Sequence, residues 1–169
     1  MRRFLFLIIV FYLLALIQSS FLIHFSLFGV IPNFILILVC LLSFFSFSGG
    51  NRDEKISLYS AFLGGFLLDI FSSSFLGLSI IVLLIISILI KKSLRVLREQ
   101  TELYSIIYFI LLFITSLIFY DLFLSIAFYW LYSAPLQFNL WIILTKMIYN
   151  LIFALPAFFI FKKYRLYAQ

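Results

Sequence analysis

The sequence predicts an all-α integral membrane protein, a bundle of six transmembrane helices formed by one polytopic domain that covers residues 1–169. Three observations support this class. Hydrophobic residues make up 66% of the chain and charged residues only 11%, too few to cover the surface of a soluble domain. The mean hydropathy is +1.28, and several apolar runs approach the length of about 20 residues that crosses a hydrocarbon core. Basic residues recur between these runs.

Six apolar runs are the expected membrane spans. They cover residues 4–23, 30–47, 56–71, 76–90, 103–128 and 140–161. The third and fourth spans are short for straight crossings, so we expect the SSSFLG segment between them to be a tight turn or a short non-helical piece. Pro32 suits the first turn of the second span, whereas Pro156 lies inside the sixth span and predicts a kink there.

The charge on the connections predicts the orientation of the spans. Lysine and arginine occur before the first span and after the second, fourth and sixth, at Arg2, Arg3, Arg52, Lys55, Lys91, Lys92, Arg95, Arg98, Lys162, Lys163 and Arg165. The three alternate connections contain neither residue type. This alternation predicts six crossings with both termini in the cytoplasm.

The longest basic connection, KKSLRVLREQTE, carries Lys91, Lys92, Arg95 and Arg98. Two arginine–glutamate pairs in it are spaced four residues apart, which favours a short surface helix. The segment is either a solvated loop beside anionic lipid or a docking element for a cytoplasmic partner.

Three charged residues fall inside the expected spans, namely Asp69, Asp121 and Lys146. With a helical rise of about 1.5 Å per residue, all three lie in the half of the membrane opposite the basic connections. A lone carboxylate in lipid is costly and seeks a partner. We therefore expect a polar cluster in which Lys146 lies between Asp69 and Asp121, with hydrogen bonds supplied by Asn150 and Gln18.

Three roles are open for this cluster. It is a buried ion pair that fixes the helix register, a pocket for a polar headgroup or small ligand open to the outer face, or a set of charges that reach to the interface. Gly64 and Gly65 lie one turn before Asp69. They are expected either to let another helix approach closely or to mark a kink.

The sequence predicts no enzyme activity, no metal site and no cofactor. The single histidine, His24, and the single cysteine, Cys40, cannot form a conventional metal site, and Cys40 in its apolar run resembles a small hydrophobe. No glycine-rich phosphate loop with its lysine is present. The positive charge lies outside the apolar runs, so it indicates membrane topology and contact with anionic lipids rather than nucleic-acid binding.

Several short motifs follow one another along the first half of the chain. They are LIQSSFL at residues 16–22, GVIPNFILILV at residues 29–39, and GGFLLDIFSSSFLG at residues 64–77. In these motifs the chain resembles the MreD family of rod shape-determining membrane proteins. The matching positions are Pro32, Asn33, Gly65, Asp69 and Gly77. The chain departs from the family at residues 72–74, where serines replace a frequent proline, and its second half matches only as apolar spans.

The resemblance implies a non-enzymatic scaffold subunit of the bacterial wall-elongation complex in the cytoplasmic (inner) membrane. It also implies direct pairing with an MreC-like single-span protein, and through it connections to MreB, RodA and the transpeptidase of RodA. The implied six-helix fold resembles the substrate-binding component of energy-coupling-factor vitamin transporters. The alternative function is therefore that of such a transporter component. The first span argues against this alternative, since it lacks the stripe of small residues with which those proteins dock their membrane partner.

Overall fold

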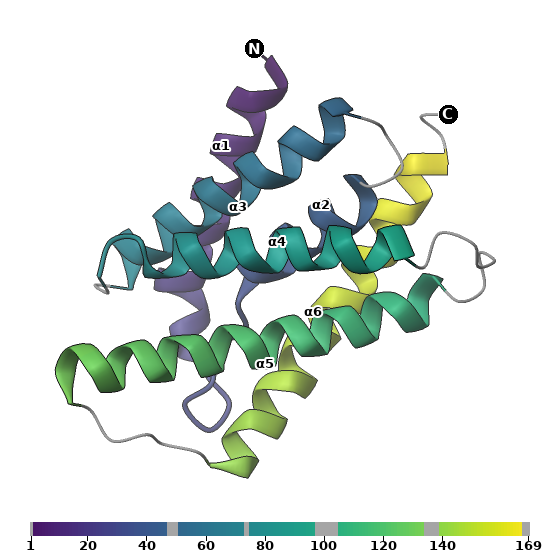
Figure 1. Ribbon diagram of the computed structural model, residues 1–169. Helices are drawn as coiled ribbons and strands as arrows, with labels where there is room; N and C mark the ends of the chain where they lie inside the picture. The colour runs from purple at the N-terminus through teal and green to yellow at the C-terminus, as the bar shows by residue number, and fades with distance from the viewer. Residues whose placement is uncertain (1, 47–50, 73–74, 97–104, 134–138, 167–169) are drawn as a thin grey trace.

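The computed structural model describes residues 2–46, 51–72, 75–96, 105–133 and 139–166. Within these ranges the chain forms six α-helices, shown in Figure 1. They are α1 (Arg2–Leu16), α2 (Phe34–Ser46), α3 (Asn51–Phe71), α4 (Leu78–Val96), α5 (Ser105–Tyr132) and α6 (Leu140–Leu166). After α1 the chain continues through a π-helical turn, η1 (Ile17–Phe21), and a 3-10 turn, η2 (Leu22–Phe25). The number and order of helices agree with the sequence prediction.

Three helical stretches in the described part of the chain are long and apolar enough to cross a membrane. They are Leu5–Phe25, Ile106–Leu131 and Leu140–Tyr164. The helix Phe34–Ser46 is apolar but shorter. The fold is therefore that of a helical membrane protein with helices of unequal length.

The start of α2 differs from the sequence expectation. The helix begins at Phe34, four residues later than expected, because a tight turn precedes it. Leu27 and Val30 exchange two backbone hydrogen bonds of 3.0 and 2.9 Å, and Gly29 between them has a φ of +77°. Pro32 consequently lies outside the helix, so its expected place in the first turn is wrong.

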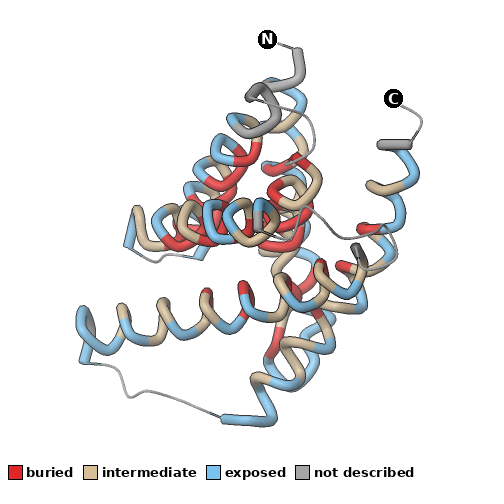
Figure 2. The backbone as a smooth tube through the Cα atoms, turned by 45° about the vertical axis from the view of Figure 1, so that its right-hand side comes forward, coloured by how far each residue is buried: buried red, intermediate tan, exposed pale blue. Residues whose placement is uncertain are grey.

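The helix α2 is the centre of the bundle although it is the shortest of the six α-helices. It contacts all five other helices, and eight of its residues are buried. Around it, α3 packs most extensively against α4, and α1 lies against α3. In Figure 2 the buried residues gather where the helices meet, whereas the last part of α5 and the first part of α6 are a mixture of intermediate and exposed residues.

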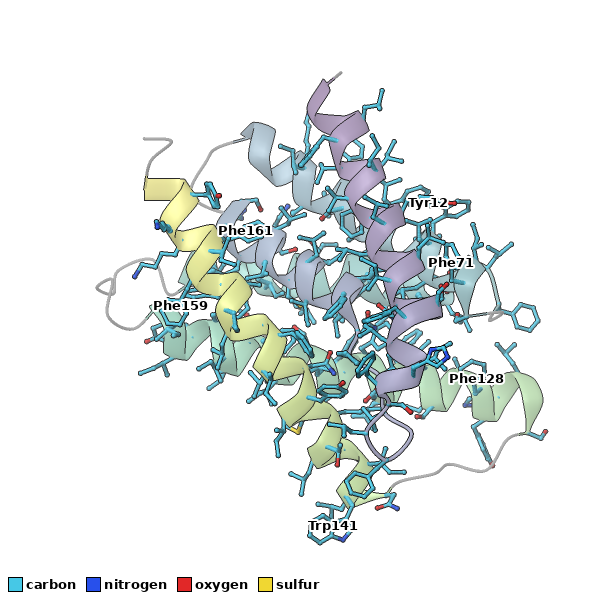
Figure 3. The ribbon with its side chains drawn as sticks, turned by 180° about the vertical axis from the view of Figure 1, so that it is seen from behind. Tyr12, Phe71, Phe128, Trp141, Phe159 and Phe161 are labelled. Atoms are coloured by element: carbon cyan, nitrogen blue, oxygen red, sulfur yellow. The ribbon has the colours of Figure 1, made fainter. Side chains whose placement is uncertain are left out.

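Aromatic side chains fill the space between α2, α5 and α6. The rings of Phe109 and Phe158 stack with centroids 4.7 Å apart, and Phe44 and Phe45 pack against Phe158 at 5.8 and 5.2 Å. Between α1 and α3, the ring centroids of Tyr12 and Phe71 lie 6.3 Å apart. Both side chains are labelled in Figure 3. Phenylalanine therefore supplies much of the contact that positions α5 and α6.

Three serines join α2, α3 and α4 within this apolar core. Ser43 donates a hydrogen bond to Ser87 at 2.9 Å, and Ser87 donates to Ser57 at 3.4 Å. All three are fully buried. Hydroxyl pairs of this kind hold helices together in membranes without introducing charge.

The helix ends fall into two groups in Figure 1. The starts of α1, α3 and α5 and the ends of α2, α4 and α6 lie toward the top and right of the view, together with both termini. We call this side the basic end, because Lys55, Lys92 and Lys163 belong to it. The opposite side, with the Leu27–Val30 turn, is called the neutral end. Trp141 lies there, at the start of α6, which is at the bottom of Figure 3.

Candidate functional site: a polar layer at the neutral end

Asp69 lies in the last turn of α3 and is buried, with an exposed fraction of 1%. Its carboxylate accepts hydrogen bonds from the backbone N–H groups of Gly77 at 2.7 Å and Ser79 at 3.0 Å. These groups belong to the start of α4, where the first N–H groups of a helix have no partner within the helix. The positive end of the helix dipole also favours an anion there. Asp69 therefore caps α4, which explains an aspartate in an apolar helix.

Gly65, Asp69 and Gly77 form one structural unit. At Gly65 the backbones of α3 and α4 touch, since an added Cβ atom would overlap the backbone of Ile80. This is the close helix approach that the sequence allowed for. Gly77 has a φ of +110°, a left-handed conformation that glycine adopts without strain. In the α3–α4 hairpin, Gly65 thus provides the helix contact, Asp69 the cap and Gly77 the turn.

The start of α2 is capped by residues from three elements. The side chain of Asn33 accepts a hydrogen bond from the backbone N–H of Leu36 at 3.0 Å, as an N-cap residue does. The backbone N–H of Asn33 donates to Oδ1 of Asn150 in α6 at 2.8 Å, and that of Phe34 donates to Oε1 of Gln18 at 3.1 Å. Side chains from the η1 turn and from α6 therefore both accept hydrogen bonds at the start of α2.

Tyr120 connects the two capped helix starts. Its hydroxyl lies 3.4 Å from Oγ of Ser79 in α4 and also faces the side chain of Asn33. Six side chains, one from each helix or its flanking turn, thus form a continuous group. We call it the polar layer, and its members are Gln18, Asn33, Asp69, Ser79, Tyr120 and Asn150.

Lys146 pairs with Asp121 and not with Asp69. Nζ of Lys146 lies 3.1 Å from Oδ1 of Asp121, and the two side chains are 36% and 28% exposed. The expectation that Lys146 lies between both aspartates is therefore wrong. The physical reason is that the N–H groups at the start of α4 already provide hydrogen bonds to Asp69.

The ion pair of Lys146 and Asp121 lowers the cost of having charges in the membrane. Placing one charge at the centre of a membrane helix costs about 3 kcal/mol on insertion scales, and pairing offsets part of the cost that each ion would bear alone.

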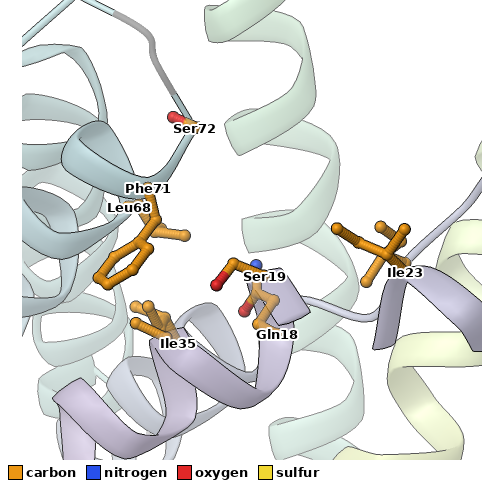
Figure 4. A pocket seen from close by; sticks show the side chains of 9 residues that line it. Gln18, Ser19, Ile23, Ile35, Leu68, Phe71 and Ser72 are labelled. Carbon is orange, nitrogen blue, oxygen red and sulfur yellow. The ribbon is translucent and has the colours of Figure 1, made fainter. Parts of the chain in front are cut away.

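Two hollows border these residues. The first has a volume of about 240 Å³ and lies between α1 with its η1 turn, α2 and α3. In Figure 4 its walls include Leu68 and Phe71 on one side and Gln18 and Ser19 on the other. The second is a groove of about 140 Å³ between α5 and α6, and Asp121 and Lys146 line it.

The predicted basic connection is partly described. Lys91, Lys92 and Arg95 lie on the last turns of α4, which runs to Val96 and so extends beyond the expected span end at residue 90. Arg98 lies outside the described residues. In the described ranges, no three His, Cys, Asp or Glu side chains lie close enough together to hold a metal ion.

Sequence reasoning missed the roles of Ser79 and Tyr120, because neither residue type is unusual in an apolar helix. It also missed the cap formed by Asn33, although an asparagine immediately before an apolar run is a signal for a helix start. The contact between Asn33 and Asn150 could not be predicted, because it depends on how α2 and α6 pack together.

These features define a class: a helical membrane protein whose polar side chains gather at one end of the bundle. Within this class, the family model of the rod shape-determining protein MreD matches residues 1–165. The chain therefore belongs to the MreD family, and the family suggests a role in determining rod shape. Comparisons with curated proteins and with solved structures give no significant match.

Proposed function

We propose that this protein is a non-catalytic scaffold subunit of the bacterial rod-shape and wall-elongation complex. The family match carries the proposal, because rod-shape determination is what the family is named for. The structure supports it in one respect. The polar layer is engaged in hydrogen bonds between helices, so holding the bundle together accounts for these residues without a chemical reaction.

The proposed topology has six membrane crossings, with the basic end and both termini in the cytoplasm. The grouping of lysine-bearing helix ends on one side supports it, as the positive-inside rule requires. The short α2 is compatible with a crossing because its neighbours surround it. Of the non-helical segment before it, residues 30–33 are shielded, since Val30 and Pro32 are buried.

The proposed direct partner is an MreC-like single-span protein, through which the complex reaches MreB, RodA and the transpeptidase. Only 17% of the apolar stretch is buried in both Leu5–Phe25 and Leu140–Tyr164. Leu5, Ile9 and Leu13 of α1 are about half exposed and follow one another at helical spacing. Such faces suit lipid and equally suit close packing with a partner's span.

Purification from native membranes tests the proposal. The tagged protein is extracted in mild detergent, and the chains that accompany it are identified by mass. Recovery of an MreC-like single-span protein together with MreB or RodA is the expected result. Recovery of ATPase subunits with a coupling subunit would instead identify a vitamin-transporter component and overturn the scaffold.

A face-specific variant makes this test sharper. Ile9→Trp adds bulk to the exposed face of α1 without touching the core, and Ile148→Trp does the same on α6, where Ile148 is 60% exposed. Loss of the partner in one variant, with normal protein levels in both, assigns the docking face. Retention in both variants excludes these two faces.

A further inference from the structure

The ion pair between Asp121 and Lys146 faces the groove between α5 and α6 instead of the bundle core. Both residues line this groove, which has a volume of about 140 Å³. About a third of each side chain is accessible from outside. Charged side chains inside a membrane protein are costly; they face the bundle interior or a polar cavity and mark candidate functional sites there. The position of this pair therefore indicates that the groove binds a polar or charged group.

The pair has unused hydrogen-bonding capacity. Their one mutual hydrogen bond joins Nζ of Lys146 to Oδ1 of Asp121. Among the described residues, Oδ2 of Asp121 and two of the three N–H groups of Lys146 have no other partner. A group that fits must offer a hydrogen-bond donor with positive charge to Asp121 and an acceptor with negative charge to Lys146.

The groove is mainly apolar, and its uncharged polar residues lie toward one end. Ser125 and Asn139 line it on the side of the neutral end, beside apolar residues such as Ile142, whereas Leu117 and Met147 line it on the side of the bundle centre. The charged pair lies between these two parts. An amphipathic molecule can therefore place its polar group beside Asp121 and Lys146 and its apolar chain along the helices.

We infer that the groove between α5 and α6 binds the headgroup of an aminophospholipid, with its ammonium at Asp121 and its phosphate at Lys146. A primary ammonium carries N–H donors for Oδ2 of Asp121. The quaternary ammonium of a choline lipid carries none, and the glycerol headgroup of an anionic lipid carries no positive charge. The charge pattern of the groove therefore favours phosphatidylethanolamine over phosphatidylcholine and phosphatidylglycerol. This inference does not depend on the scaffold proposal.

Native mass spectrometry of the full chain tests the inference directly. The purified protein is exposed to phosphatidylethanolamine and phosphatidylcholine with identical acyl chains, and retention of each lipid is measured. We expect a preference of about tenfold for phosphatidylethanolamine, the factor that one charge-assisted hydrogen bond typically provides. Equal retention of the two lipids would overturn the inference.

A double variant separates the groove from the rest of the surface. Asp121→Asn with Lys146→Gln removes both charges together, so neither is left unpaired and we expect the fold to be preserved. The lipid preference is expected to disappear. Lys163→Gln, on an exposed position of the same helix at the basic end, serves as the matched control and retains it. A preference that survives the double variant contradicts the proposed site.

The same spectra distinguish a protein occupant. If the native chain forms a dimer that the double variant dissociates, the groove is an interface between copies and the lipid site is wrong. If a co-purified partner chain is lost in the double variant, the groove belongs to that partner, which also overturns the inference.

Discussion

At the scale of single residues, the buried carboxylate of Asp69 closes the start of α4. Asp69→Leu leaves the N–H groups of Gly77 and Ser79 buried without acceptors, which is expected to cost about 3 kcal/mol. Asp69→Asn keeps one acceptor oxygen and is expected to cost roughly 1 kcal/mol. Thermal unfolding of the purified variants in detergent measures the difference. Two variants as stable as the native protein would show that the cap contributes nothing.

Asn150 holds the start of α2 from a distance of 117 positions along the chain. Asn150→Leu removes the acceptor for the N–H of Asn33, so we expect the midpoint of thermal unfolding to fall, at a cost of about 1–2 kcal/mol. Thr145→Val is the control on the same helix, because the hydroxyl of Thr145 bonds only to the carbonyl of Trp141 one turn earlier. Equal effects of the two changes would contradict a role for Asn150 between helices.

At the scale of helices, the close packing of α3 against α4 depends on Gly65, which faces the backbone of α4, whereas Gly64 faces side chains of α1 and α2. An added Cβ at Gly65 lies 2.6 Å from the backbone nitrogen of Ile80, whereas at Gly64 it meets only side-chain atoms of Ile35, Phe11 and Val39, the nearest at 2.9 Å. Backbone atoms can make room for a new methyl group only if the whole helix moves, whereas side chains can make room by changing their conformation. Gly65→Ala is therefore expected to destabilise the fold by more than the 1–3 kcal/mol typical of added core bulk, and Gly64→Ala by about that amount.

The measurement for this pair is resistance to a protease in detergent together with the unfolding midpoint. The backbone is helical at both glycines, so any change in helix propensity is the same in the two variants. A larger loss for Gly64→Ala than for Gly65→Ala would show that the helices do not approach as described.

Helix existence and order could be predicted from the sequence, because long apolar runs and the recurrence of lysine and arginine are local signals. The start of α2 was placed too early, because the residues of the hydrogen-bonded turn at Leu27–Val30 are as apolar as those of the helix; Asn33 was the local signal for the true start. The polar residues inside the spans were identifiable one by one. Their pairing was not, because Asp69 can reach either a lysine in another helix or the N–H groups of α4, and only the packed hairpin selects the second.

At the scale of the whole molecule, the two ends of the bundle differ in charge and are expected to face opposite sides of the membrane. The only cysteine, Cys40, is buried, so Cys40→Ala gives a background for single-cysteine labelling. Phe28→Cys lies at the neutral end, where Phe28 is 89% exposed. In intact cells it should react with a membrane-impermeant thiol reagent, and Lys92→Cys should react only after permeabilisation. The reverse pattern would invert the topology.

Polar groups inside this bundle join helix ends, and Asp69 is the clearest case. Amide hydrogen exchange at Gly77 and Ser79 tests this role most directly, because the first N–H groups of a helix exchange quickly unless something outside the helix holds them. We expect slow exchange at these two amides in the native protein and much faster exchange in Asp69→Leu. Exchange that is fast in the native protein, or unchanged by the substitution, would show that Asp69 does not hold the start of α4.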